Sequence, residues 1–243
     1  MDDGAKAKAN ITAYWNTLSP TYDDAPDHRV RSEAEQQAWL AVLRPLLPPP
    51  PARLLDLGTG TGFLALLLAE LGHQVLGIDI AADMLAVARE KAVGLASPPE
   101  FRVGDATAPP VEAGSVDAIV SRHLLWTLPD PLGALENWHR TLCPGGRLIV
   151  IDGLWALGVE LDAPSPPPPA DDPYATYYTP EVRAQLPLLG ARSLDQVFTL
   201  IAQAGFAAPQ ALPPEALARL IDAAHGGGHQ HSGRFVVTAV RDG

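Results

Sequence analysis

Apolar and polar residues follow two different periods along the chain, and together they predict strands that alternate with helices. Short apolar runs, such as Arg53–Leu57, are typical of buried strands, whereas apolar residues three or four positions apart, as in Ala82–Ala92, are typical of helices. The pattern predicts strands over residues 53–57, 74–78, 100–103, 116–120 and 147–151, and helices over 62–71, 82–92 and 131–142. This alternation implies an α/β domain in which helices cover both faces of a parallel sheet.

The segments on either side of this core also show regular patterns. Residues 5–18 and 29–43 carry apolar side chains at helical spacing, so we expect two helices before the first strand. A long irregular stretch over 153–192 precedes a helix over 194–204, a strand over 206–212, a helix over 214–223 and a last strand over 234–240. We therefore predict a single domain over 1–243, divided into N-terminal helices (1–47), a core (52–152), an insertion (153–192) and a C-terminal helix and strand hairpin (193–243).

Composition and charge restrict the classes of partner. Of the 243 residues, 47% are hydrophobic and 19% are charged, so a sizeable core is available. The formal net charge of −11 argues against a standing affinity for nucleic acid or an anionic membrane, because both require basic patches. The single cysteine, Cys143, excludes an internal disulfide. The polar N-terminus and the lack of a long apolar run lead us to expect a cytoplasmic protein that does not span a membrane.

A glycine-rich turn after the first strand is the most informative stretch. Asp56 lies at the end of the strand, glycines follow at positions 58, 60 and 62, and Phe63 stands where a dinucleotide-binding fingerprint has its third glycine. A carboxylate at this turn favours a positively charged ligand over a pyrophosphate. A second acid, Asp79, ends the next strand and suits the ribose hydroxyls of a nucleoside.

The D-x-G-x-G-x-G pattern, with Asp79 beyond it, resembles the S-adenosylmethionine (SAM) site of class I methyltransferases. The Pro-Gly-Gly turn within residues 142–147 also resembles the turn before the fifth strand of this family. The resemblance implies a Rossmann-like, seven-stranded sheet in the order 3-2-1-4-5-7-6, with strand 7 antiparallel and helices on both faces. It also implies that the core binds SAM, that the N-terminal helices form a lid, and that the insertion covers the substrate.

The resemblance assigns cofactor contacts residue by residue. Gly58, Thr59 and Gly60 would lie against the methionine part of SAM. Asp56 would orient the ammonium group, directly or through water, and Asp79 would bind both ribose hydroxyls. The complete set of expected cofactor contacts is Tyr14, Tyr22, Asp56, Gly58, Thr59, Gly60, Asp79, Ile80, Met84, Asp105, Ala106 and Arg122.

Further cofactor contacts implied by the resemblance come from the third and fourth strands and from the N-terminal segment. Asp105 and the N–H of Ala106 would recognise the adenine, although an aspartate here can also simply initiate a turn. Arg122 would pass near the methionine part through its backbone. Tyr14 and Tyr22 would contact the carboxylate or methyl region from the lid; the alternative for Tyr14 is packing within its helix.

Two histidines are candidates for proton transfer. By the resemblance, His123 follows the fourth strand and would face the transferred methyl group, and His28 would lie at the pocket mouth. Histidine titrates near neutral pH, so either can act as a general base if the acceptor is a hydroxyl. The alternatives are a hydrogen-bonded residue at a strand end for His123 and simple exposure for His28. An amine acceptor would need neither of them.

Two other clusters have open interpretations. Tyr174, Tyr177 and Tyr178 in the insertion indicate either a substrate cover or packing on the protein itself. Histidines at positions 225, 229 and 231 surround three glycines, and imidazoles bind zinc well. Because no cysteine or carboxylate pattern accompanies these histidines, we expect a flexible hairpin loop and no metal.

The leading hypothesis is a SAM-dependent methyltransferase that acts on N or O of a small organic metabolite, as in natural-product tailoring. Ser121–Arg122–His123 stands where DNA and glutamine-amide methyltransferases carry a [DNS]-P-P-[YFW] motif, which argues against those classes. One alternative is a SAM-binding protein without turnover. Another is a nicotinamide-dependent oxidoreductase, against which Asp56 and Phe63 argue. A monomer and a homodimer are both compatible with the sequence.

Overall fold

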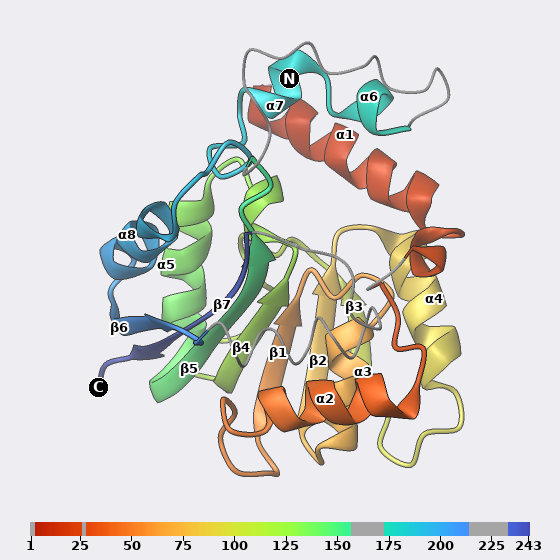
Figure 1. Ribbon diagram of the computed structural model, residues 1–243, viewed down its shortest axis with the longest axis vertical. Coiled ribbons are helices and arrows are strands. Elements are labelled where there is room, and N and C mark those ends of the chain that lie inside the picture. The colour runs from red at the N-terminus through yellow and green to blue at the C-terminus, as the bar shows by residue number, and fades with distance from the viewer. Residues whose placement is uncertain (1–2, 26–27, 157–172, 214–232) are drawn as a thin grey trace.

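A seven-stranded β-sheet forms the centre of the molecule (Figure 1). The computed structural model describes residues 3–25, 28–156, 173–213 and 233–243. The strands are β1 (Arg53–Leu57), β2 (Gln74–Asp79), β3 (Glu100–Val103), β4 (Val116–Arg122), β5 (Leu142–Gly153), β6 (Phe206–Ala211) and β7 (Arg234–Arg241). Their order is β3-β2-β1-β4-β5-β7-β6, with β1 to β5 parallel and β7 antiparallel to β5 and β6. The predicted fold class and strand order are confirmed.

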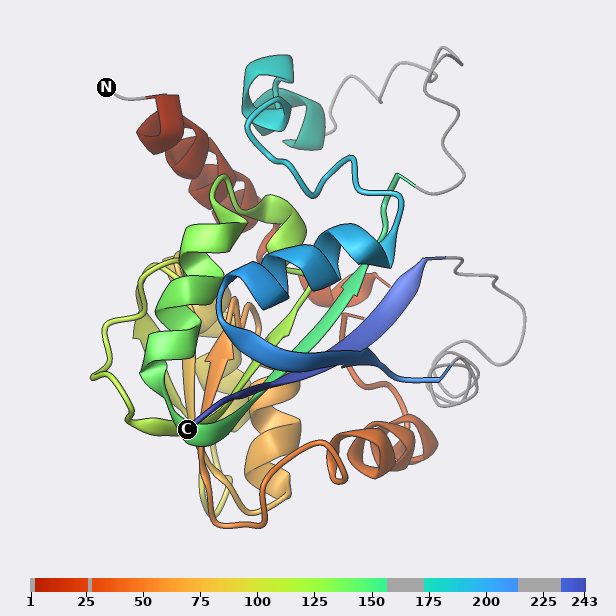
Figure 2. The same ribbon diagram turned by 90° about the vertical axis from the view of Figure 1, so that its left-hand side faces the viewer.

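Helices cover both faces of the sheet. They are α1 (Asp3–Leu18), α2 (Glu33–Leu43), α3 (Phe63–Glu70), α4 (Ala82–Ala92), α5 (Pro131–Thr141), α6 (Pro173–Tyr177), α7 (Pro180–Arg183) and α8 (Leu194–Gln203), with short 3-10 helices η1 (Tyr22–Asp24) and η2 (Leu125–Thr127). Helices α5 and α8 pack on one face, and α2 and α3 pack on the other (Figure 2). The apolar interior is therefore divided into two layers by the sheet.

The alternation of side chains along each strand explains the two layers. Leu55 and Ile119 belong to the layer under α5 and α8, whereas their neighbours Leu54 and Ala118 belong to the layer under α2 and α3. Successive residues of a strand point to opposite faces, so a strand covered on both sides reads as a continuous apolar run. This is why the sequence predicted these strands without a polar-apolar alternation.

Three predictions differ from the structure by more than two residues or in kind. The helix expected over 29–43 begins only at Glu33, because Ser32 caps it: the Ser32 hydroxyl accepts from the N–H of Glu35 at 3.1 Å. The insertion expected to be irregular contains α6 and α7 in its described part. Strand β5 begins at Leu142 because it includes the Pro-Gly-Gly turn. The helix expected over 214–223 lies outside the described residues.

Helix α1 lies at the end of the sheet where β1, β2 and β4 finish, together with α6 and α7 (Figure 1). Its apolar residues Ala7 and Ile11 form a separate cluster with Tyr178, Val182 and Leu186. The N-terminal helix and the end of the insertion therefore pack on each other. Within the described residues, no helix is both long and apolar enough to cross a membrane.

Polar contacts attach the N-terminal segment to the core. The side-chain oxygen of Asn16 accepts from the N–H of Asp83 at 3.1 Å. Asp23 accepts from the Thr61 hydroxyl at 2.7 Å and from the Lys91 ammonium at 2.8 Å. Asp23 thus connects the segment after α1 to both the glycine turn and α4. This arrangement covers the sheet edge where the sequence placed its ligand contacts.

Candidate active site

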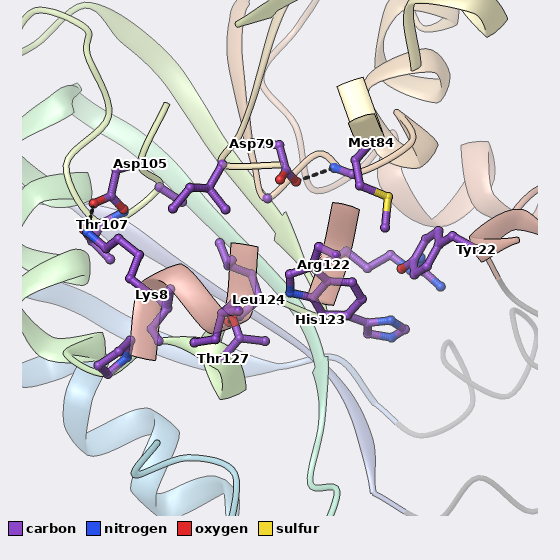
Figure 3. Close-up of a pocket in the computed structure, with 18 residues that line it drawn as sticks. Lys8, Tyr22, Asp79, Met84, Asp105, Thr107, Arg122, His123, Leu124 and Thr127 are labelled. Carbon is purple, nitrogen blue, oxygen red and sulfur yellow. Dashed lines mark hydrogen bonds and ion pairs between the residues drawn. The ribbon is translucent and has the colours of Figure 1, made fainter. Parts of the chain in front are cut away.

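A pocket lies between the carboxyl ends of the central strands and helix α1 (Figure 3). Including its open mouth, it contains about 750 Å³ of space. We call it the main pocket. Its lining comprises Lys8, Ile11, Trp15, Tyr22, Gly58, Gly60, Asp79, Ile80, Met84, Asp105, Ala106, Thr107, Arg122, His123, Leu124, Thr127, Leu128 and Pro129. Most of the residues expected to bind the cofactor are therefore brought together.

Several lining residues were not predicted from the sequence. Lys8, Ile11 and Trp15 come from α1, and their spacing of three and four residues places them on one face of that helix. This spacing is the signal that could have identified them. The other unexpected residues are Thr107 after β3 and Thr127, Leu128 and Pro129 in and after η2, where no motif marks them.

The glycine turn exposes its backbone to the main pocket. Gly58 and Gly60 have φ of 67° and 54°, the left-handed region that favours glycine. A Cβ added at Gly58 would lie 2.8 Å from Leu124 Cδ1, whereas one at Gly60 would meet nothing within 4 Å. The N–H of Gly60 donates to Asp79 Oδ2 at 2.8 Å. The turn is thus held against β2 and leaves room for a ligand beside Gly60.

Two buried carboxyls flank this turn. Asp56 Oδ2 accepts from the Thr59 hydroxyl at 2.6 Å and from the N–H of Ala65 at 3.1 Å. Burial raises the pKa of Asp56 to about 7, against the lowering effect of these hydrogen bonds. Asp79 Oδ1 accepts from the N–H of Ala81 at 2.8 Å, and burial raises the pKa of Asp79 as well. Asp56 and Thr59 line a small space beside the main pocket, whereas Asp79 faces the main pocket itself.

Asp105 lies at one end of the main pocket with Lys8 and Thr107 (Figure 3). Asp105 Oδ1 accepts from the N–H of Thr107 at 2.9 Å, and Asp105 Oδ2 forms an ion pair with the Lys8 ammonium. Burial alone would raise the pKa of Asp105, but the hydrogen bonds from Lys8 and Thr107 lower it below its ordinary value. This end of the pocket therefore offers an ionised acceptor.

Arg122 and Tyr22 lie at the other end of the main pocket (Figure 3). The buried Arg122 guanidinium carbon lies 4.3 Å from the ring centroid of Phe63 and 5.7 Å from that of Trp39. These distances are within the range of cation–π contact. Arg122 also lines the small space beside Asp56. The sequence assigned only the Arg122 backbone to this region, whereas the structure also brings its charged side chain there.

A second cavity of about 690 Å³ adjoins the main pocket, and we call it the aromatic pocket. Its lining comprises Tyr14, Trp15, Leu18, Tyr22, His28, His123, Trp126, Trp155, Tyr174 and Leu189. Trp15, Tyr22 and His123 line both cavities. Tyr14 and His28 line the aromatic pocket and not the main pocket. The two predicted histidines therefore share one cavity.

His123 has an unusual backbone conformation, with φ of 54° in a residue that is not glycine. Its N–H donates to the Ile151 carbonyl at 2.9 Å, and its ring packs edge-on against Trp155 at 5.2 Å between centroids. Such strain persists only where the surroundings impose it, and it is concentrated at functional sites. Burial lowers the pKa of His123 well below its ordinary value, and the nearby charges of Arg122 and Arg234 add to this effect. His123 is therefore neutral near pH 7.

The tyrosines of the insertion have divided roles. Tyr178 is buried and stacks on Trp126 and on Tyr174, with ring centroids 5.6 Å and 4.6 Å away. Tyr174 also lines the aromatic pocket. Tyr178 thus packs on the protein, while Tyr174 faces the cavity. Among the described residues, no group of histidine, cysteine and acidic side chains could hold a metal ion, and the histidines at 225, 229 and 231 lie outside that part of the chain.

Known proteins are similar to this chain in sequence and in fold. The family described as "Methyltransferase domain" matches residues 55–150. The demethylmenaquinone methyltransferase of Thermus thermophilus is 34% identical over 179 residues, which cover 72% of this chain and 74% of that protein. The chain belongs to the class I SAM-dependent methyltransferases. This membership confirms SAM as the cofactor and decides against the nicotinamide-dependent oxidoreductase.

Other similar proteins are named for different reactions. The ubiquinone biosynthesis O-methyltransferase of Xanthomonas axonopodis pv. citri is 36% identical over 105 residues, which cover 43% of this methyltransferase and 44% of that protein. The crystal structure of the [4+2]-cyclase SpnF has a TM-score of 0.64 at 19% identity and covers 96% of both chains. This second likeness shows the fold alone, because a fold by itself does not fix a function.

Proposed function

We propose that this methyltransferase transfers a methyl group from SAM in the main pocket to N or O of a small organic acceptor in the aromatic pocket. One observation carries the proposal: Trp15, Tyr22 and His123 form a common wall of the two cavities. An acceptor in one cavity would then lie beside the methyl group of a cofactor in the other. The predicted setting in natural-product tailoring is part of this proposal.

The residues around the main pocket fit the parts of SAM in order. The adenine would bind at the end near Asp105 and Ala106, and the ribose hydroxyls would bind Asp79. The glycine turn would lie against the methionine part, whose ammonium would face Asp56. We add that the guanidinium of Arg122, at the same end as Asp56, would bind the methionine carboxylate. The ammonium of SAM would then lie near the Asp56 carboxylate, and the carboxylate of SAM would lie near the Arg122 guanidinium, so opposite charges are paired at this end.

SAM supplies a methyl group on a positively charged sulfur, which is already activated for displacement. The protein then has to align the acceptor and exclude water, and such alignment can contribute roughly 7–11 kcal/mol. Helix α1 covers the main pocket through Ile11 and Trp15, while the aromatic rings hold the acceptor. For a hydroxyl acceptor, His123 would accept the proton, because it lines both cavities and is neutral.

The relatives support a small organic acceptor. The names of the two proteins compared above refer to demethylmenaquinone and to ubiquinone biosynthesis. Compounds of that kind contain flat rings, and flat rings suit a cavity lined by tryptophan and tyrosine. The net charge of −11 also argues against a nucleic-acid acceptor.

A transfer assay tests this proposal. The full chain is incubated with SAM and a panel of hydroxyarenes, reduced quinones and aromatic amines, and mass spectrometry follows S-adenosylhomocysteine and the methylated product. We expect both products in equal amounts from at least one ring-containing acceptor, and none from the Asp79→Ala variant at limiting SAM. Tight binding of S-adenosylhomocysteine without methylation of any acceptor would contradict the proposal.

A SAM-binding protein without methyl transfer is the second candidate. The fold of a [4+2]-cyclase covers 96% of this chain, so the same architecture also serves a protein named for a different reaction. The transfer assay separates the two candidates, because the second one consumes no SAM under any of its conditions.

The proposed contact between Asp56 and the ammonium of SAM predicts a pH dependence. Burial raises the pKa of Asp56 to about 7, although the hydrogen bonds from Thr59 and Ala65 lower it, and the smaller effects of Asp79 and Arg122 oppose each other, so the carboxyl is mostly protonated at pH 6. Only the ionised form attracts an ammonium group. We therefore expect the affinity for SAM to rise about fivefold between pH 6 and pH 7, with release of protons on binding.

Isothermal titration calorimetry in two buffers of different ionisation enthalpy measures both the affinity and the released protons. Asp56→Asn is the matched variant, because it keeps the size of the side chain and cannot titrate. We expect weaker binding by this variant and a flat profile between pH 6 and pH 7. An equally steep profile in Asp56→Asn would assign the titration to another group, such as Asp79.

A further inference from the structure

Asp152, near the end of β5, is a buried acid that has no part in the proposed methyl transfer. The residue is 3% exposed. Its side chain is not among the described residues that line the main pocket or the aromatic pocket. A buried carboxylate is costly unless hydrogen bonds compensate its charge. The hydrogen bonds of Asp152 therefore show which parts of the chain depend on it.

The carboxyl of Asp152 accepts hydrogen bonds from two separate segments. Oδ2 accepts from the N–H of Leu125 at 3.0 Å, in the segment that follows β4. The N–H of Leu124, in the same segment, is a further donor. Oδ1 accepts from the N–H of Gly153 at 2.8 Å and from Nε1 of Trp155 at 3.2 Å. Asp152 thus joins the exit of β4 to the indole ring of Trp155.

The two segments that Asp152 holds meet at His123. The Trp155 ring packs edge-on against the His123 ring, with centroids 5.2 Å apart. The two backbone donors after β4 directly follow His123, whose φ of 54° is a strained conformation for a residue other than glycine. The N–H of His123 itself donates to the carbonyl of Ile151, the residue before Asp152. The end of β5 therefore restrains both the backbone and the ring of His123.

We propose that Asp152 is a positioning residue for methyl transfer, because it holds His123 and Trp155 in place as walls of the acceptor site. The inference rests on the proposed function, which places the acceptor in the aromatic pocket. His123 lines both pockets, and Trp155 lines the aromatic pocket. A displaced wall would move the acceptor relative to the methyl group, and a misplacement of about 1 Å can lower a rate about 10²-fold.

The partners of Asp152 require an ionised acid rather than an amide. Each of the hydrogen bonds described above is donated to the carboxyl, and both of its oxygens accept. Asparagine has only one oxygen, so its NH₂ group would face an N–H donor on the other side. Asp152→Asn would therefore release either the exit of β4 or Trp155. Burial raises the pKa of Asp152 to about 7, although the hydrogen bonds lower it, so the carboxyl is mostly ionised at pH 8.

The indole N–H signals of the five tryptophans test this placement by NMR. The full chain is labelled with nitrogen-15 tryptophan and saturated with S-adenosylhomocysteine at pH 8, and Trp155→Phe identifies the signal of Trp155. We expect Asp152→Asn to move the signals of Trp155 and of Trp126, whose rings pack with centroids 6.2 Å apart. The signal of Trp138 should not move, because its Nε1 donates to the carbonyl of Ala106 at 2.6 Å, away from Asp152.

Calorimetry with two ligands separates positioning from general support of the fold. 2-Naphthol is a flat ring that probes the aromatic pocket of the chain saturated with S-adenosylhomocysteine. We expect Asp152→Asn to bind 2-naphthol about tenfold more weakly, the equivalent of one lost ring contact, and to bind S-adenosylhomocysteine at most about threefold more weakly. Asp117→Asn is the matched control, because Asp117 lies at the opposite end of the sheet and accepts from the N–H of Arg53 at 2.8 Å.

Two results for a folded Asp152→Asn variant would overturn the inference: unmoved signals of Trp155 and Trp126, or equal losses of affinity for the two ligands. Failure of the wild-type chain to bind 2-naphthol would instead contradict the acceptor site of the proposed function, and the indole signals would still decide whether Asp152 holds the walls.

Hydrogen exchange of the wild-type chain serves if Asp152→Asn does not fold. Although Trp155 is 38% exposed, its bond to Asp152 should slow the exchange of its indole hydrogen about tenfold or more relative to free tryptophan. Exchange of the Trp155 indole hydrogen at the rate of free tryptophan would show that Asp152 does not hold the ring.

Discussion

Replacing Asp79 by alanine is expected to weaken the binding of SAM by about 10²- to 10⁴-fold. Asp79 ends β2 beside the glycine turn and faces the main pocket. A hydrogen bond to a charged group contributes about 1.5–3 kcal/mol, so the loss of bonds to two ribose hydroxyls amounts to roughly 3–6 kcal/mol. Asp79→Asn keeps one acceptor and is expected to lose about half of that free energy.

Calorimetry with three ligands checks this expectation. SAM, S-adenosylhomocysteine and 5′-methylthioadenosine share the ribose, and only the third lacks the amino-acid part, so all three should lose affinity alike. Asp79 also holds the turn, since its carboxylate accepts from Gly60 and Ala81, and a melting curve of each variant reports any loss of fold. Unchanged binding of 5′-methylthioadenosine by a folded Asp79→Ala variant would remove Asp79 from the ribose.

The core of the fold was predictable because its signals are local. Strands β1 and β3 have the predicted bounds, and β2 extends the prediction by only Asp79. Strands β1 and β2 are short apolar runs ended by a glycine or an acid and are buried along most of their length, whereas β3 lies at the edge of the sheet and is mostly exposed. The order of strands did not come from periodicity; it came from the family resemblance. The alternation of strands and helices along the chain predicts a parallel sheet, but many strand orders are compatible with a parallel sheet.

The lid side of the site was less predictable because its contacts join distant parts of the chain. Lys8 pairs with Asp105, which lies 97 positions away, and nothing in either local sequence indicates the pair. The same holds for Tyr178, whose stacking on Trp126 decides that it packs inward while Tyr174 faces the cavity. The sequence left both alternatives open for these tyrosines, since only tertiary packing distinguishes them.

The sequence therefore predicts the conformation of motif residues better than that of the residues around them. Gly58 and Gly60 were identified by residue type, because only glycine readily adopts their positive φ. His123 adopts a similar φ without being glycine, so its strain could not be read from its residue type. The strain is imposed by the exit from β4 and by the bond from His123 to Ile151 on β5. The cofactor end of the site thus follows from motifs, whereas the acceptor end depends on the completed fold.

Arg122 is the clearest case of a side chain whose proposed role emerges only from the structure, and its removal has the second large effect that we expect. Arg122→Met keeps an apolar stem against Phe63 and removes the charge that would bind the methionine carboxylate. The loss of one charge-assisted interaction of about 1.5–3 kcal/mol corresponds to about 10- to 100-fold weaker binding of SAM and S-adenosylhomocysteine. Arg122→Lys keeps the charge without the planar fork and should lose less.

The three ligands that test Asp79 also test Arg122, but the expected pattern of affinities is different. 5′-Methylthioadenosine lacks the amino-acid part, so its affinity should be unchanged in Arg122→Met, although it falls in Asp79→Ala. A purely structural role for Arg122 would give a different result. The Arg122 guanidinium packs on Phe63 and Trp39, so its removal would displace these two rings and weaken the binding of every ligand by disturbing the glycine turn. Equal losses for all three ligands would therefore assign Arg122 to the support of the turn, and a loss confined to ligands with a carboxylate would assign it to the cofactor.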